Sequence, residues 1–434
     1  MRVSSDGGIA EPVTARAEGE GTHNFPVFAP NGETVLFTVW SSSLGNARLA
    51  AVSLRTGERR LLGDGYFPRF APMGHLIYAQ AGAVWAVPFD ADLLEMIGDP
   101  VQVLEDVRVE GGGAVQFDLA ENGAAVYIAG GLIRAERALV LVDRAGREES
   151  LNVPPRAYQS VAISPDGTRI ALEVLGSGLE DLWLYDVRGQ SASQLTFDAA
   201  DDLWPVWTPD GERVLFLSQR GGPYGLFSKR ADGTGQPEQL VSFEGQPLLW
   251  SIAPDGRTLA GTDSTPETGW DLLSVALEGE LQLQPLLADN FQETNPEISP
   301  DGRWLAYASD ESGQREIYVS PFPNPAEGKW RVSRDGGTEP LWAADGRELF
   351  YRDGSAVLAV SVDTSSAFTS GEPQLLFTGP YYRTGLFRGH TYDVMPDGQK
   401  FVMIRESEMD TAGSEIIVIQ NWLEELERLV PTDP

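Results

Sequence analysis

The chain of 434 residues contains no cysteine, which excludes disulfide bonds, thiolate catalysis and zinc sites built on cysteine. It has only three histidines, His23, His75 and His390, far apart in the sequence, so a Ser-His-Asp triad or a paired-histidine metal site has little support. The sequence also lacks a Gly-x-Ser-x-Gly elbow, a His-Arg-Asp catalytic loop, an Asp-Phe-Gly motif and a calcium-binding loop. We therefore expect no enzymatic activity, no metal and no cofactor.

No apolar run is long enough to span a bilayer. Residues 1–21 lack the basic and then apolar pattern of a secretory signal, so the chain as written is expected to stay where it is made.

Basic residues are scarce: 32 against 64 acidic residues, which gives a net charge of −32. Such a chain is repelled by phosphate backbones and anionic lipids, so nucleic acid is not an expected partner. A protein or peptide fits better, and a basic one fits best. The alternative is that acidic loops only keep an all-β surface soluble.

Glycine (47) and proline (29) are abundant and mark an internal repeat. Ser164-Pro165-Asp166-Gly167 recurs in full or in part eight more times. In this turn proline fixes φ, Asp or Asn bonds its own backbone, and glycine takes a positive φ. The marker glycines are 32, 74, 123, 167, 211, 256, 302, 346 and 398, at spacings of 42, 49, 44, 44, 45, 46, 44 and 52.

Short alternating strands flank each marker, as in residues 160–164, 169–174, 181–186 and 193–197. A period near 44 with four strands predicts an all-β chain of nine four-stranded β-propeller blades. A proline also recurs before the first strand of five repeats, at Pro26, Pro68, Pro205, Pro296 and Pro340, which we interpret as a strand start.

The repeats at 76–104 and 349–377 resemble each other and lie six repeats apart. This favours two domains: residues 1–146 as three blades, the back half of a propeller, and residues 147–434 as a six-bladed propeller. Residues 392–395, 400–405 and 415–420 would form three strands of the last blade, and residues 147–153 would supply its missing fourth strand. The alternative is one nine-bladed ring, closed by residues 12–17. Apolar residues at helical spacing in 421–430 predict a short amphipathic C-terminal helix packed on the outer edge.

The marker, together with strands such as Trp304-Leu305-Ala306-Tyr307, resembles the TolB-like propeller repeats of bacteria. The run from Ile317 through Gly336-Gly337-Thr338-Glu339-Pro340 to the ending Asn421-Trp422-Leu423 resembles the C-terminal propeller region of bacterial membrane-anchored serine/threonine kinases. That resemblance implies a sensor or interaction module, extracytoplasmic if it follows a kinase domain and a membrane helix.

Loops that join one blade to the next place carboxylates beside aromatic residues. An acidic, aromatic-lined funnel suits a cationic peptide through cation–π and charge-assisted contacts. Packing of the tryptophans between blades is the alternative. The candidate binding residues are Asp201, Asp202, Trp204, Trp250, Glu293, Asp335, Glu339, Tyr381 and Tyr382.

The sequence thus favours a non-enzymatic protein- or ligand-binding sensor or scaffold of a kinase-associated family. The alternative is an accessory domain of a kinase or peptidase whose catalytic domain is not in this chain. The oligomeric state is left open.

Overall fold

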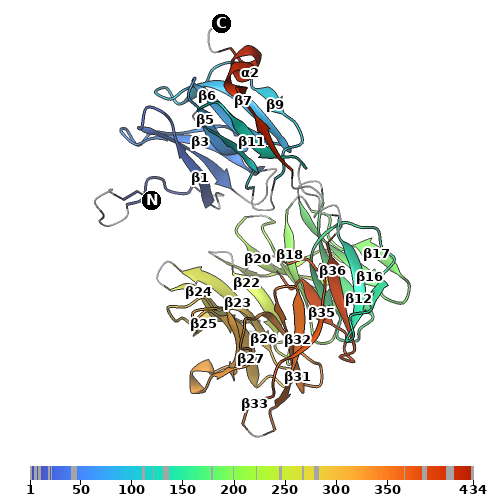
Figure 1. The fold of residues 1–434 in the computed structure, drawn as a ribbon. Helices are drawn as coiled ribbons and strands as arrows, with labels where there is room; N and C mark the ends of the chain where they lie inside the picture. The colour runs from blue at the N-terminus through green and yellow to red at the C-terminus, as the bar shows by residue number, and fades with distance from the viewer. Residues whose placement is uncertain are drawn as a thin grey trace. The chain divides into compact units, whose positions relative to one another are not determined.

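The protein forms two compact units, and the sequence of unit 2 lies between the two segments of unit 1 (Figure 1). Unit 1 comprises Met1–Arg134 and Glu408–Pro434, and unit 2 comprises Ala135–Ser407. A computed structural model describes residues 2–3, 7, 11–17, 20, 22–40, 46–109, 113–120, 122–130, 136–176, 179–198, 200–220, 222–243, 247–265, 268–277, 283–365, 367–383, 389–406 and 415–431.

The marker turns connect the first and second strands of every sheet, as the repeat predicts. Gly167 has φ +69° and Gly211 has φ +68°, a region that other residues rarely adopt. The Asp166 carboxylate accepts the Thr168 N–H at 3.0 Å, and Asp210 accepts the Glu212 N–H at 2.9 Å. Turn chemistry therefore explains why the marker recurs.

The second recurring proline lies inside the first strand and not at its start. The residue before it has φ between +50° and +56°, and the strand register shifts at the same place. Because a bulge inserts an extra residue and re-aims side chains, proline fits there without losing a ladder bond. The prediction of a strand start was wrong. The five bulge residues are Phe25, Phe67, Trp204, Asn295 and Glu339.

Unit 2 contains six antiparallel sheets in the part of the chain that the structure describes. Five of them run in chain order, with short loops between consecutive strands. Their strands are β14 (Ala157–Ile163), β15 (Arg169–Leu175), β16 (Glu180–Asp186) and β17 (Ser191–Gln194); β18 (Asp202–Trp207), β19 (Arg213–Ser218), β20 (Gly225–Arg230) and β21 (Glu238–Ser242); β22 (Leu248–Ile252), β23 (Thr258–Thr265), β24 (Gly269–Ala276) and β25 (Leu283–Leu287); β26 (Thr294–Ile298), β27 (Trp304–Ser309), β28 (Glu316–Pro321) and β29 (Trp330–Arg331); β30 (Thr338–Trp342), β31 (Glu348–Asp353), β32 (Ala356–Asp363), β33 (Thr369–Ser370) and β34 (Gln374–Thr378).

The sixth sheet joins the two ends of unit 2, in the order β13-β12-β36-β35. Its strands are β12 (Ala138–Asp143), β13 (Glu148–Ser150), β35 (Tyr392–Val394) and β36 (Lys400–Arg405). Strand β12 pairs with β36 along its whole length, from Ala138 opposite Arg405 to Asp143 opposite Lys400. The sequence assigned one closing strand, at 147–153, to the sheet that contains β35 and β36. The structure uses two strands there, β12 and β13, because the apolar run of β12 forms a strand of its own beside β36.

Apolar clusters connect the six sheets in a cycle. Each cluster draws its buried residues from two neighbouring sheets, and the cycle returns from the β36 sheet to the β14 sheet. The first strands of neighbouring sheets contact one another, for example β14 with β18 and β35 with β14. These first strands therefore meet at the centre of unit 2, which we call the hub. This radial arrangement confirms the predicted propeller fold.

Unit 1 holds three sheets among the described residues. The strands are β1 (Thr22–Phe28), β2 (Thr34–Trp40), β3 (Arg48–Ser53) and β4 (Arg59–Asp64); β5 (Tyr66–Ala71), β6 (His75–Gln80), β7 (Ala83–Asp90), β8 (Glu95–Met96) and β9 (Val101–Leu104); and β10 (Phe117–Leu119), β11 (Ala125–Ile128) and β37 (Ile416–Ile419). The two repeats that resemble each other in sequence form the two five-stranded sheets, β5–β9 and β30–β34.

Strand β37 returns to unit 1 after the whole of unit 2 and pairs with β11, so the sequence assignment of 415–420 to the last blade was wrong. The red strand beside β11 in Figure 1 shows this pairing. Helix α2 (Trp422–Leu429) then buries Trp422 and Leu426 against β5–β7 and β10–β11. The buried His75 imidazole contacts the Val430 carbonyl at 2.6 Å, and so holds the end of this helix.

The predicted domain boundary at 146/147 falls between β12 and β13, which belong to one sheet, and the contacts divide the chain near residue 135 instead. Within the described part of the chain, no helix has the length and apolar character to cross a membrane.

Candidate functional site

The predicted acidic residues of the β17–β18 loop are buried. The Asp202 side chain is 0% exposed and pairs with Arg220 at 2.6 Å; burial raises the pKa of Asp202. Asp201 accepts the Glu180 N–H at 2.9 Å. Both carboxylates thus satisfy groups of the sheets they join, and neither lies on an open surface.

Glu339 and Glu293 are also buried. The Glu339 carboxylate accepts both the N–H of Thr391, at 2.8 Å, and its hydroxyl, at 2.7 Å. Glu293 accepts the Ser309 hydroxyl at 3.2 Å, while its second oxygen has no partner. Burial is the main reason that the pKa of Glu293 rises to about 7.

The predicted aromatic residues mostly pack. The Tyr381 hydroxyl donates to Glu148 at 2.9 Å, and the Tyr382 hydroxyl donates to Gln159 at 2.8 Å. The guanidinium of Arg137 lies 3.4 Å from the centre of the Tyr382 ring. Trp250 lies in β22, and its side chain is outside the described residues.

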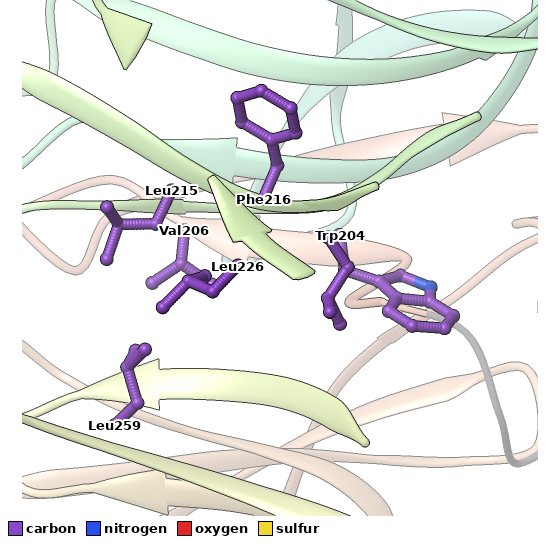
Figure 2. Close-up of a pocket in the computed structure, with 7 residues that line it drawn as sticks. Trp204, Val206, Leu215, Phe216, Leu226 and Leu259 are labelled. Carbon is purple, nitrogen blue, oxygen red and sulfur yellow. The ribbon is translucent and has the colours of Figure 1, made fainter. Parts of the chain in front are cut away.

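Trp204 lines a gap between the β18 and β22 sheets that is too narrow for a water molecule (Figure 2). Its indole nitrogen lies on the ring edge away from the aliphatic residues and has no hydrogen-bond partner, although the residue is only 7% exposed. The gap is therefore a packing defect, but the N–H is an unused donor.

Of the nine predicted binding residues, Asp335 is the one that the structure describes as exposed; six are buried and Tyr382 is half-buried. Their role in binding stays a prediction. Their burial gives most of them a part in holding neighbouring sheets and loops together.

A second group of titratable residues, which the sequence reasoning missed, meets at the hub. Glu297 in β26 lies 3.7 Å from the His390 imidazole, measured from Oε2 to Nε2. Asp393 in β35 accepts the Ile163 N–H at 2.6 Å. Burial raises the pKa of Asp393 to about 7; burial, and then the charge of Asp393, raise the pKa of Glu297.

Glu297 is enclosed by protein and yet keeps 21% of its side chain exposed. It comes from one sheet, hydrogen-bonds Ser251 of a second and contacts His390 beside a third. Glu297 therefore lies among neighbours from more than one sheet at the hub and is still partly exposed.

The repeat itself contained the signal for this group. Glu297 and Asp393 both lie three residues before the marker proline or its equivalent. The residues in the same position of the six sheets are Ala162, Val206, Ser251, Glu297, Leu341 and Asp393. Only two of six equivalent positions are acidic, so the acids are a departure from the repeat. No group of three or more described residues has the arrangement of a metal site.

Comparison with known proteins supports the fold. Residues 138–269 match the family model described as PD40, the TolB beta propeller domain. An uncharacterized protein of Agrobacterium fabrum is 24% identical over 212 residues, which are 44% of this chain and 67% of the relative. A TolB homolog of Chlorobium luteolum is 23% identical over 288 residues, 55% of this chain and 60% of the relative.

A solved structure described as a TolB of Agrobacterium tumefaciens aligns with a TM-score of 0.52 at 18% identity, over 63% of this chain and 98% of the other. The chain spans about two thirds or less of the length of the two curated relatives named above. Residues 138–269 are thus similar to the TolB beta propeller domain, and the solved structure supports a propeller fold.

Proposed function

We propose that this protein is a non-catalytic binding module whose unit 2 recognises a protein or peptide at the hub. One observation carries the proposal: Glu297, Asp393 and His390 converge there from different elements, where four of the six equivalent positions hold uncharged residues. Buried carboxylates with raised pKa values are a feature of functional sites. The TolB-like fold supports it further, because TolB-like propellers bind proteins.

The proposed site lies on first-strand residues at the hub, whereas the sequence placed the candidate site on the loops that join one blade to the next. Reversing the charge of Asp201, Asp202 and Glu339 would not test binding. These carboxylates are buried and hydrogen-bonded, so their charge reversal would destabilise the fold itself. We also propose that the module is the sensor part of a larger kinase-associated protein. An in-frame kinase domain upstream would support this context, and a complete gene without one would contradict it.

The test is partner capture by the full chain. Glu297→Gln keeps the shape of the side chain and removes one hub charge, and Glu212→Gln, at an exposed position, is the matched control. Proteins recovered from an extract of the producing organism are compared by quantitative mass spectrometry. We expect the hub variant to lose a partner that the wild type and the control retain, with no loss of thermal stability. Equal capture by the hub variant would contradict the proposal.

A further inference from the structure

The segment 389–391 crosses the hub. The His390 carbonyl accepts the Val161 N–H of β14 at 2.9 Å, and its imidazole faces Glu297 of β26. Gly389 lies so close to Trp204 of β18 that a Cβ there would be 2.9 Å from the indole Cδ1. Residues of three different sheets therefore touch two consecutive residues of one connection.

A buried network holds this segment in place. Arg352 is 1% exposed and donates to the Thr391 hydroxyl at 2.5 Å and to the Tyr382 carbonyl at 2.6 Å. Glu339 accepts both polar hydrogens of Thr391. Anchoring by residues outside the hub means that the 389–391 backbone does not depend on the His390 side chain.

His390 presents to Glu297 a group that is cationic when protonated. It occupies the position that the ammonium or guanidinium of a bound ligand would take against Glu297. Because burial raises the pKa of Glu297 and of Asp393, a cation bound there would favour their charged forms.

An independent observation comes from Trp204. Its indole N–H is buried without a partner, and its pyrrole edge lies beside Gly389, the residue next to His390. An unmade hydrogen bond of a buried donor costs free energy, so the position favours an acceptor such as a peptide carbonyl.

We infer that the hub takes a peptide segment carrying a basic side chain: the cation lies against Glu297 and Asp393, and a main-chain carbonyl accepts the Trp204 N–H. His390 is an internal occupant that this cation displaces. The inference rests on the proposed function and specifies its ligand chemistry.

The probe is a blocked tripeptide, acetyl-Gly-Arg-Gly-amide, titrated by NMR into the full chain. The same peptide with citrulline replacing arginine keeps the shape and loses the charge. We expect His390→Ala to bind the arginine peptide about tenfold more tightly than the wild type, because the internal occupant is gone. Adding Glu297→Gln should remove about tenfold of affinity, the value of a charge-assisted contact.

Trp204→Phe should weaken the arginine and citrulline peptides alike, about fivefold, because it removes only the carbonyl contact. The exposed Glu212→Gln is the matched control and should change neither affinity. If His390→Ala binds both peptides equally, or binds neither, the inference is overturned. Partner capture tests the proposed function separately. If the hub variant loses its partner but the two peptides bind equally well, the hub is a binding site and its ligand is not basic.

Discussion

Glu293 places an acidic side chain where ionisation is costly. It is 1% exposed, one carboxylate oxygen lacks a partner, and its pKa rises from 4.5 to about 7, first through burial and then through neighbouring Asp289 and Asp271. A rise of this size corresponds to about 3 kcal/mol at about 1.4 kcal/mol per pH unit. Because Glu293 lies in a loop before β26, solvent relieves part of that cost, and we expect Glu293→Gln to stabilise by about 1–3 kcal/mol at pH 8.

The pH dependence has a definite sign. Below the ordinary value of 4.5 both folded and unfolded states hold the proton, and the side chain costs nothing. As pH rises to about 7 the unfolded chain ionises first, so wild-type stability falls across this window. Thermal unfolding should therefore show Glu293→Gln above wild type at pH 8, by about 2–4 °C for each kcal/mol, and equal to it near pH 4. The exposed Glu212→Gln is the control. A gain that is independent of pH, or a loss at pH 8, would refute the reasoning.

Two further predictions concern the connections. Deleting residues 408–434 removes β37 and the buried Trp422 and Leu426 from unit 1, a loss of about 5 kcal/mol of apolar burial. Calorimetry should then show unit 1 unfolded and unit 2 intact. Loss of both unfolding transitions would contradict the division into two units. Arg352→Met leaves three carbonyl and hydroxyl acceptors unpaired, which should cost about 3 kcal/mol and make the connection 379–392 the first site of limited proteolysis; unchanged protection there would contradict its anchoring role.

The turns and strands could be predicted from the sequence because their chemistry is local. The proline, aspartate and glycine of the marker act within four residues, and the structure has a turn at each of the nine markers. The two repeats that resemble each other form the two five-stranded sheets, although the sequence predicted four strands in every blade. Local rules suffice wherever a residue's partner is its neighbour in sequence.

Pairing across the insertion could not be predicted in the same way. The alternation in Ile416–Ile419 indicates a strand, but nothing in it distinguishes β11 from β36 as the partner. The burial of the candidate site residues could not be predicted for a related reason. Carboxylates near aromatic residues look like a funnel in sequence, whereas their exposure depends on partners such as Arg220 and Thr391, which lie 18 and 52 residues away.

Closure of unit 2 by β12 and β36 is the claim on which the hub depends. Ala138 and Arg405 are half-buried partners in this ladder, within reach of a disulfide, and the chain has no cysteine of its own to interfere. Ala138→Cys with Arg405→Cys should form an intramolecular disulfide, found by mass spectrometry of the linked peptides. Ala138→Cys with Lys400→Cys should not, because Lys400 pairs with Asp143 at the other end of the same ladder. Equal yields from the two pairs, or no disulfide from the first, would contradict the closed ring.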